Sequence, residues 1–339
     1  MHTLWRLFLL LLILLFGLAV FINILVLGSP IEPVKAYGVT FSKHYAKMFQ
    51  GVDWKTQYLA ILHELGVKHL RFGAYWTDIE PKKGDWHFED LDWQLAEAKN
   101  SGADVIVLDI ANSQSIVALN AVKNFRIKFP DMELVVGNIV LPKAVSVFRD
   151  CGVNGFKVGL GPGSACTTRK NTNIGIPQAQ AIYDCALKSN VPICADGGIK
   201  RNGSIATALM LGAGSVMIGG MFSGTDEAPG QVFRDSRGNK VKSFRGMASR
   251  EAMHEKLHAE NYDNPYEISS RISPEGIEKK VDYRGSVVPI INEMMDNLAS
   301  TISYIGAMSL QEAKEMFMEH PASYLIKLSE SAKRESWDR

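Results

Sequence analysis

Residues 155–170 read GFKVGLGPGSACTTRK, an apolar run that leads directly into a glycine-rich turn. The run predicts a strand, and the glycines let the backbone of the turn approach an anion closely and direct amide groups at it. Cys166 stands at the rim of this turn, where nearby amides favour its thiolate, and Thr168 can hold or move a proton. The layout suits covalent attack on a phosphorylated ligand; the alternative is a structural turn around a buried cysteine.

Outward from this turn, short apolar strands alternate with helices along the chain. Strands are expected at 37–42, 69–75, 105–109, 134–137, 155–159, 191–195 and 215–219. Helices are expected at 53–66, with Asp53 as N-cap, and at 90–102, 115–129, 142–151, 176–189, 202–212 and 287–304. Repeated βα units predict an α/β fold, a parallel (β/α)8-type barrel. The charged, Gly- and Pro-rich insert at about 225–283 predicts a mobile flap.

Composition narrows the functional classes. The chain of 339 residues has a formal net charge of +1, so nothing indicates a nucleic-acid partner. Its four cysteines lie far apart without metal-ligand spacing, which favours a reducing compartment.

Residues 7–27 are almost wholly apolar and long enough to cross a bilayer core. No Ala-x-Ala cleavage site follows, so we expect an uncleaved transmembrane anchor rather than a signal peptide. Lysines after the segment outnumber the basic residues before it, which predicts a membrane-anchored protein with a cytoplasmic catalytic body. The expected organisation is an anchor at 1–28, a linker at 29–36, segments at 37–98 and 99–330, and a polar tail at 331–339.

A series of motifs in residues 99–330 resembles the IMP dehydrogenase/GMP reductase family. The matching stretches are VIVLDIANSQS (105–115), VGNIV (136–140), KVGLGPGSACTTRK (157–170), GIPQ (175–178), ADGGI (195–199), VMIGGMFSGTDEAPG (216–230), RGMAS (245–249) and PEGIE (274–278). The resemblance implies a purine nucleotide oxidoreductase acting on GMP or IMP with NADPH or NAD. It also implies a homo-oligomer.

The family's catalytic residues carry over onto matching positions. Cys166 matches the nucleophile that adds to purine C2 and forms a thioimidate, Thr168 its proton-handling neighbour, and Glu275 the flap glutamate that pairs with that threonine. A solvated loop acid is the alternative for Glu275.

The binding residues implied by the resemblance form three sets. Those matching nucleotide-binding positions are Ser164, Asp196, Gly198, Gly219, Gly220, Asn138, Arg245, Gly246 and Met247, with Asp196 on the ribose hydroxyls and the serine and glycines on the phosphate. Those matching cofactor-side positions are Asp109, Ala111 and Asn112. The carbonyls of Gly161, Gly163 and Cys166 match a site for a monovalent cation, K⁺.

The direction of reaction is decided by smaller differences. The long insert with its EAPG and PEGIE motifs resembles IMP dehydrogenase, which makes XMP from IMP and NAD. However, Asn261–Tyr262 stands where that enzyme has an Arg-Tyr pair, and Phe244 replaces a tyrosine that donates to the phosphate. The DIAN, CTTRK and GGMF stretches resemble GMP reductase, which needs no hydrolytic water. We therefore favour the reductase, which deaminates GMP to IMP.

Residues 37–98 have a different resemblance, to the first two βα units of barrel glycoside hydrolases. Trp76, Glu80 and Trp86 lie in the most telling stretch, but Glu80 has no evident carboxylate partner for hydrolysis. Two strands from this part and about five from the other fall one short of the usual eight, so a chimeric or incomplete barrel is expected. An inactive barrel or a membrane-anchored glycan-binding protein is therefore the alternative from another class.

Overall fold

The computed structural model describes residues 38–41, 43, 53–64, 69–72, 82, 85, 87–102, 105–228, 230–259, 264–271, 273–324 and 329. The chain divides into two compact units. One comprises Met1–Phe41 and Leu59–Ala103, and the other comprises Ser42–Tyr58 and Asp104–Arg339.

The first unit holds a small parallel sheet. Its strands β1 (Gly38–Phe41) and β2 (His69–Phe72) pair in parallel, with Phe41 opposite Phe72. Helix α5 (Glu89–Asn100) begins with three acidic residues in its first turn, which favours a helix N-terminus. The predicted strands and helix are confirmed here, while Trp76, Glu80 and Trp86 lie outside the described residues.

Helix α3 (Trp54–His63) spans the division between the units. The Asp53 carboxylate accepts hydrogen bonds from the backbone N–H and the hydroxyl of Thr56, both at 3.0 Å. These bonds satisfy groups that the first turn of a helix leaves unpaired and hold the pKa of Asp53 below its usual value. The predicted N-cap is confirmed.

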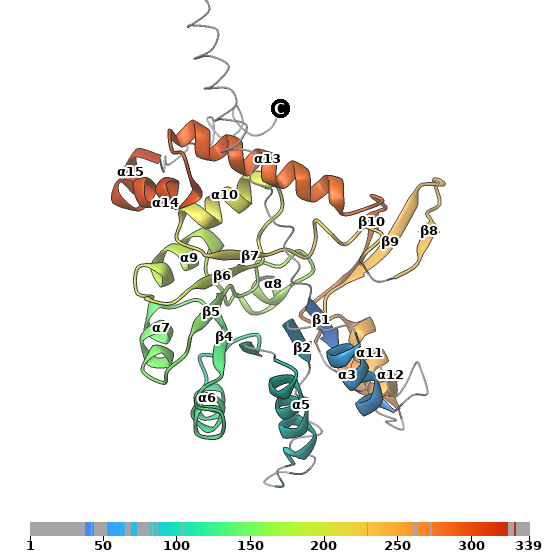
Figure 1. Cartoon of the computed structure of the whole chain (residues 1–339). Helices are drawn as coiled ribbons and strands as arrows, with labels where there is room; N and C mark the ends of the chain where they lie inside the picture. The colour runs from blue at the N-terminus through green and yellow to red at the C-terminus, as the bar shows by residue number, and fades with distance from the viewer. Residues whose placement is uncertain are drawn as a thin grey trace, which may run out of the picture. The chain divides into compact units, whose positions relative to one another are not determined.

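The second unit is built on a five-stranded parallel sheet. Its strands are β3 (Val105–Asp109), β4 (Glu133–Ile139), β5 (Gly155–Val158), β6 (Ile193–Asp196) and β7 (Ser215–Met217). Their spatial order is the chain order, β3-β4-β5-β6-β7, which Figure 1 shows in a run from green to yellow. This singly wound order is that of (β/α) barrels, and it gathers all five carboxyl ends at one edge of the sheet. The α/β prediction is confirmed.

Helices connect the successive strands of this sheet. They are α6 (Ile116–Lys128), α7 (Pro142–Arg149), α8 (Thr168–Thr172), α9 (Gln178–Ala186) and α10 (Asn202–Met210). Each of the four longer helices buries one face, with side chains such as Val122, Val145, Phe148, Ile182 and Leu209 in the core. Ser115 caps α6, since its hydroxyl accepts from the N–H of Ala118.

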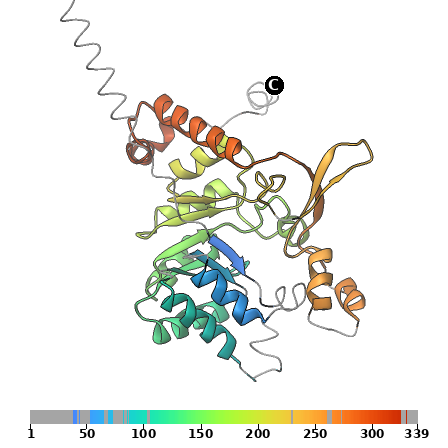
Figure 2. The same cartoon turned by 45° about the vertical axis from the view of Figure 1, so that its right-hand side comes forward.

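The insert after β7 is a folded substructure. Strands β8 (Val232–Arg234), β9 (Lys240–Arg245) and β10 (Glu278–Asp282) form an antiparallel sheet in the order β10-β9-β8. Between β9 and β10 lie α11 (Arg250–Ala259) and α12 (Pro265–Arg271). Figures 1 and 2 show the strands as a ribbon that extends away from the parallel sheet. Sequence analysis expected a flap here and did not foresee its strands.

Three helices complete the second unit: α13 (Val288–Ile305), α14 (Leu310–Glu319) and α15 (Pro321–Tyr324). Both α13 and α14 pack against α10, an arrangement visible in Figure 2. The predicted helix at 287–304 is confirmed by α13.

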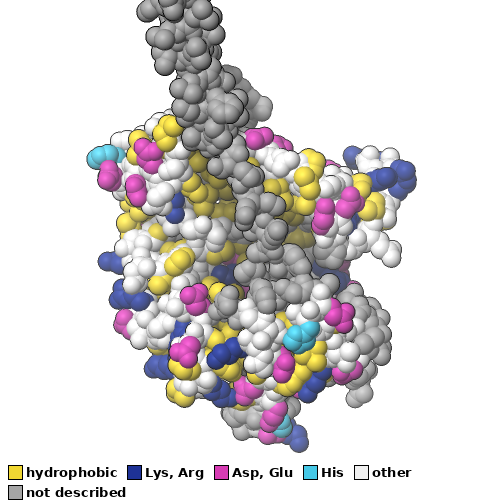
Figure 3. Space-filling view, viewed as in Figure 1, with side chains coloured by type: hydrophobic (Ala, Val, Ile, Leu, Met, Phe, Trp, Pro, Cys, Tyr) yellow, Lys and Arg dark blue, Asp and Glu magenta, His cyan; other side chains and the backbone are white. Residues whose placement is uncertain are grey.

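The predicted membrane localisation is corrected. Within the described ranges, the chain forms no helix that has both the length and the apolar character needed to cross a bilayer. This finding contradicts the membrane-anchored assignment, and the apolar stretch at 7–27 on which it depended lies outside the described residues. On the face drawn in Figure 3, acidic and basic side chains are interspersed.

Candidate active site

The turn that carries Cys166 leaves the carboxyl end of β5 and leads into α8. The N–H of Cys166 donates to the carbonyl of Gly163 at 3.0 Å, which closes a tight loop below the thiol. Gly161 has a φ of +78°, and a Cβ there would lie 2.5 Å from Cγ of Arg169. A left-handed backbone and this close packing both require glycine, so the turn depends on its sequence.

Cys166, Thr168 and Glu275 form a continuous hydrogen-bonded chain. The Cys166 thiol donates to the Thr168 hydroxyl at 3.2 Å between Sγ and Oγ1. That hydroxyl donates to Oε2 of Glu275 at 2.6 Å. All three side chains are partly buried. The structure therefore brings together the three residues predicted to be catalytic, although 107 positions separate Thr168 from Glu275.

Main-chain hydrogen bonds hold Glu275 in this position. The stretch 274–277 lies between the cysteine turn and the loop after β9, and it bonds to both. The bonds are Thr167 N–H to Glu275 O (2.8 Å), Ile277 N–H to Ala165 O (3.0 Å), Glu275 N–H to Ala248 O (3.1 Å) and Gly246 N–H to Ile277 O (3.0 Å). A Cβ at Gly276 would lie 2.9 Å from the backbone nitrogen of Ser249, so only glycine fits without a shift. These main-chain hydrogen bonds attach the insert to the turn that carries Cys166.

Arg245 and Met247, predicted to bind nucleotide, flank Gly246 in that loop. The Arg245 guanidinium forms a two-pronged ion pair with Glu255 of α11, with one prong at 2.6 Å. Arg245 donates to this carboxylate and so holds the pKa of Glu255 below its usual value. The Met247 side chain is 86% exposed. Arg245 is therefore paired with Glu255, whereas the Met247 side chain is exposed and can contact a ligand.

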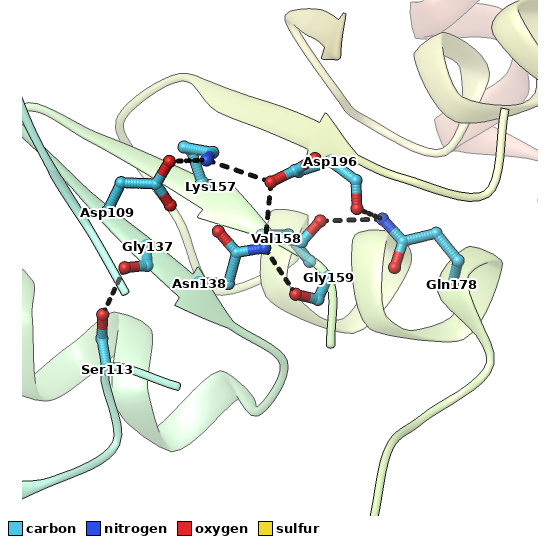
Figure 4. A network of polar contacts seen from close by, with 9 residues as sticks. All are labelled: Asp109, Ser113, Gly137, Asn138, Lys157, Val158, Gly159, Gln178 and Asp196. Atoms are coloured by element: carbon cyan, nitrogen blue, oxygen red, sulfur yellow. Dashed lines mark hydrogen bonds and ion pairs between the residues drawn. The ribbon is translucent and has the colours of Figure 1, made fainter. Parts of the chain in front are cut away.

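A buried lysine joins two of the predicted carboxylates (Figure 4). Nζ of Lys157 lies 2.6 Å from Oδ2 of Asp109 and 3.0 Å from Oδ2 of Asp196. The lysine side chain is only 4% exposed, while the two aspartates are 17% and 23% exposed. Asn138 joins the cluster, because its Nδ2 donates to Asp196 Oδ2 at 3.0 Å and to the carbonyl of Gly159 at 2.7 Å. Asp109 at the end of β3 and Asp196 at the end of β6, predicted to face the cofactor and the ribose, thus share one cation from β5.

Two amide oxygens at this edge lack partners among the described residues. They are Oδ1 of Asn138 and Oε1 of Gln178, both shielded from solvent. The Nε2 of Gln178 donates to the carbonyl of Val158 at 2.7 Å and to that of Asp196 at 3.2 Å. Buried acceptors are normally paired, so these two oxygens are available to donors on a ligand.

Sequence analysis missed Lys157 and the role of Gln178. Lys157 lies in β5, all four of whose residues are buried. A buried charge needs a partner, so a lysine within a short apolar strand, in a sheet where two other strands end in aspartate, could have revealed the cluster.

The phosphate-side residues meet around Ser164. A Cβ at Gly220 would lie 2.5 Å from Oγ of Ser164, so the loop after β7 passes directly over this serine. Gly219 has open space where its Cβ would be, and Ser164 is exposed. Gly198 follows Gly197, whose missing Cβ would lie 2.8 Å from Pro162 in the cysteine turn. The predicted phosphate residues therefore line adjoining loops.

The remaining predicted residues are less distinctive. Ala111 and Asn112 are exposed just after β3, and Asn112 Oδ1 accepts from the N–H of Gln114. Of the carbonyls proposed for a monovalent cation, that of Gly163 already accepts from Cys166. Arg169 Nε donates to the Leu160 carbonyl at 2.8 Å, so a guanidinium supplies positive charge within the same turn. This arrangement does not support a K⁺ site.

Burial affects the acidity of two other cysteines. Burial raises the pKa of Cys185 to about 12, and burial also raises the pKa of Cys194 in β6. Because the thiolate is the reactive form, neither is suited to be a nucleophile.

Comparisons with known proteins agree with this geometry. The profile described as "IMP dehydrogenase / GMP reductase domain" matches residues 87–338. Inosine-5'-monophosphate dehydrogenase of Streptococcus pyogenes is 40% identical over 240 residues, which cover 69% of this chain and 48% of that protein. The Aquifex aeolicus (strain VF5) protein of the same name is 36% identical over 230 residues, 67% of this chain and 46% of its own length. The chain spans about half the length of the curated relatives it matches.

Among solved structures, a cysteine-to-alanine variant of GMP reductase from Trypanosoma brucei in complex with guanosine 5'-monophosphate aligns with a TM-score of 0.61. It is 33% identical, and the alignment covers 72% of this chain and 51% of that one. The profile begins at residue 87, so the resemblance of residues 37–98 to glycoside hydrolases stays a prediction.

Proposed function

Since this chain belongs to the IMP dehydrogenase/GMP reductase family, we propose that it is a purine nucleotide oxidoreductase that works as a GMP reductase. The proposal depends above all on the hydrogen-bonded chain from Cys166 through Thr168 to Glu275. A thiol, a hydroxyl and a carboxylate in series can ionise the nucleophile and deliver the proton to a leaving group.

The deamination step follows from this arrangement. The Cys166 thiolate adds to C2 of the guanine ring, and the C2–N bond to the exocyclic amino group breaks. Thr168 passes the proton that the departing ammonia requires, and Glu275 supports the hydroxyl from its far side. The product of this step is a thioimidate between Sγ and C2. NADPH, held by the residues after β3, would supply a hydride for C2, and Cys166 would then leave C2 as the thiolate as the C–S bond breaks, which would give IMP.

The nucleotide is held by the neighbouring loops. We assign its ribose to Asp196, whose carboxylate can accept from two vicinal hydroxyls, and its ring side to Asn138, whose Oδ1 lacks a partner in the described part of the chain. Ser164, Gly198, Gly219 and Gly220 serve the phosphate through a hydroxyl and backbone amides.

The residues after β3 suit a nicotinamide cofactor. Asp109 ends the strand with a partly exposed carboxylate, an acceptor for ribose hydroxyls, beside the exposed stretch of Ala111 and Asn112. Lys157 holds this carboxylate in place through an ion pair at 2.6 Å.

The alternative direction is IMP dehydrogenase, in which IMP and NAD give XMP. It is favoured by the names of the curated relatives. The reductase is favoured by the sequence of the DIAN, CTTRK and GGMF stretches and by Phe244.

The deciding experiment supplies the purified chain with each substrate pair and follows the absorbance of reduced nicotinamide. GMP with NADPH should consume reduced cofactor and release ammonia faster than IMP with NAD generates it. A faster formation of XMP would reverse the direction. Absence of both reactions, together with no binding of GMP or IMP, would refute the function itself. Cys166→Ala should abolish turnover while GMP still binds.

A further inference from the structure

Phe244 stands where the resemblance leads us to expect a phosphate-donating tyrosine, so this chain lacks one polar contact to the phosphate. A nucleoside monophosphate carries close to two negative charges at neutral pH, and the serine and glycines assigned to it are neutral. The residue paired with Phe244 on the neighbouring strand, Lys279, can supply positive charge for this phosphate.

Lys279 is the cross-strand partner of Phe244 in the β9–β10 pair. Its ammonium lies over the Phe244 ring, 5.6 Å from the centroid, which directs the side chain along the face of that ring. The same ammonium donates to the main-chain carbonyl of Ser164 at 3.3 Å. A cation on the flap strand therefore reaches the residue that we assign to the phosphate.

The surroundings of Ser164 leave room for an anion beside this lysine. Ser164 is exposed, Gly220 closes over its hydroxyl, and Gly219 has open space at its Cβ position. A hydroxyl, adjacent glycine amides and an ammonium form the donor set that phosphate-binding loops use. The carbonyl that Lys279 meets is a neutral acceptor and leaves the charge of the ammonium unpaired by this contact, and the ammonium has further donors to offer.

We propose that Lys279 binds the phosphate of the purine nucleotide and replaces the contact that Phe244 cannot make. This inference rests on the proposed function, since it takes a purine nucleoside monophosphate as the ligand. The phosphate thus couples the flap strand β10 to the cysteine turn. Nucleotide binding should then favour the position in which Glu275, four residues before Lys279, meets Thr168.

The chain offers a matched control. Lys280 is the next residue of β10 and points to the opposite face, where its ammonium lies 5.4 Å from the centroid of the Phe233 ring. Lys279→Gln and Lys280→Gln therefore remove the same charge and the same kind of cation–π contact from one strand. Only the first removes the cation beside Ser164.

The experiment measures the Kd of GMP and of guanosine, which lacks the phosphate, for the wild-type chain and for Lys279→Gln, Lys279→Arg and Lys280→Gln. Lys279→Gln should raise the Kd of GMP by about five- to twentyfold and leave the Kd of guanosine unchanged. Lys279→Arg should retain most of the affinity, and Lys280→Gln should match the wild type. The GMP loss should shrink as salt is added, because screening weakens an exposed charge contact.

Two results would overturn the inference: equal losses for GMP and guanosine, which indicate a structural role for Lys279, or equal GMP affinities for the two glutamine variants. Comparing two ligands on one variant keeps the test valid even if that variant is less stable. If the wild-type chain binds neither GMP nor IMP, the proposed function fails before the variants are compared.

Discussion

Replacing Lys157 with methionine is the sharpest test of how the strand ends are held together. The substitution keeps the length and apolar stem of the side chain but removes an ammonium that is 4% exposed and lies 2.6 Å from Asp109 and 3.0 Å from Asp196. It leaves two carboxylates facing an apolar group and each other. Asp196 keeps the hydrogen bond from Asn138, so its charge is only partly compensated.

The magnitude follows from burial. At an effective dielectric of about 20, the 3.0 Å pair with Asp196 amounts to roughly 5.5 kcal/mol and the 2.6 Å pair with Asp109 to roughly 6 kcal/mol before desolvation is subtracted. Removing one partner of a buried pair costs about 3–5 kcal/mol, since the remaining charge is stranded. Asp109 and Asp196 are 17% and 23% exposed, so water reaches them and the lower end applies. We expect Lys157→Met to lower the free energy of unfolding by about 3 kcal/mol.

Urea unfolding followed by circular dichroism measures this loss. Lys242→Met is the matched control, because Lys242 is 2% exposed but donates to two main-chain carbonyls, at 2.8 and 2.5 Å, rather than to carboxylates. Its loss should be smaller. In the Lys157→Met background, Asp109→Asn should recover part of the stability, because it removes one of the two negative charges that the ammonium had paired. A loss below about 1 kcal/mol for Lys157→Met, or no recovery on adding Asp109→Asn, would refute the reasoning.

Three further predictions concern proton transfer, thiol reactivity and pH. Glu275→Gln should slow GMP deamination by roughly a hundred- to a thousandfold with little change in the Kd of GMP; stopped-flow and equilibrium binding measure the two, and an unchanged rate would remove Glu275 from the relay. Iodoacetamide at neutral pH should modify Cys166 well before Cys185, whose pKa is raised to about 12 by burial, and bound GMP should protect Cys166; mass spectrometry identifies the sites, and early loss of Cys185 would contradict its burial. Because the Arg245 ion pair lowers the pKa of Glu255, its stabilisation is full above the unfolded pKa of glutamate and is lost as pH falls through the lower folded value; Glu255→Gln should remove about 0.5 kcal/mol at neutral pH and nothing in strong acid, and an equal loss at both pH values would be inconsistent with the pair.

The parts of this molecule that sequence analysis predicted are those with local signals. Strands β3 to β7 are short apolar runs, and the helices α6, α7, α9 and α10, each with one buried face, lie between them. Cys166 and Thr168 are close in sequence, so their contact needed only the turn between them. Glu275 came from the resemblance alone, because no local pattern could show that its loop returns to the cysteine turn.

The parts that were missed depend on long-range pairing. The insert pairs β9 with β10 across two helices, and its strands are short and largely exposed, so hydrophobic periodicity was faint there. Lys157 was missed because β5 was recognised by its apolar residues, and the one charged residue within it was not considered separately. The predicted membrane anchor was wrong because it depended on the apolar composition of one stretch alone, and the described residues contain no helix able to cross a bilayer.

The cysteine turn connects the ion-pair cluster around Lys157 to the hydrogen-bonded chain that begins at Cys166. Asn138 donates to Asp196 and also to the carbonyl of Gly159, the first residue of that turn. The loop after Asp196 in turn packs Gly197 against Pro162, four residues before Cys166. A shift of Asp196 can therefore reach Cys166 through packed backbone, even when Thr168 and Glu275 are not themselves substituted. For this reason a substitution at Lys157 that leaves the chain folded should still lower kcat, whereas one at Lys279 should act on nucleotide affinity.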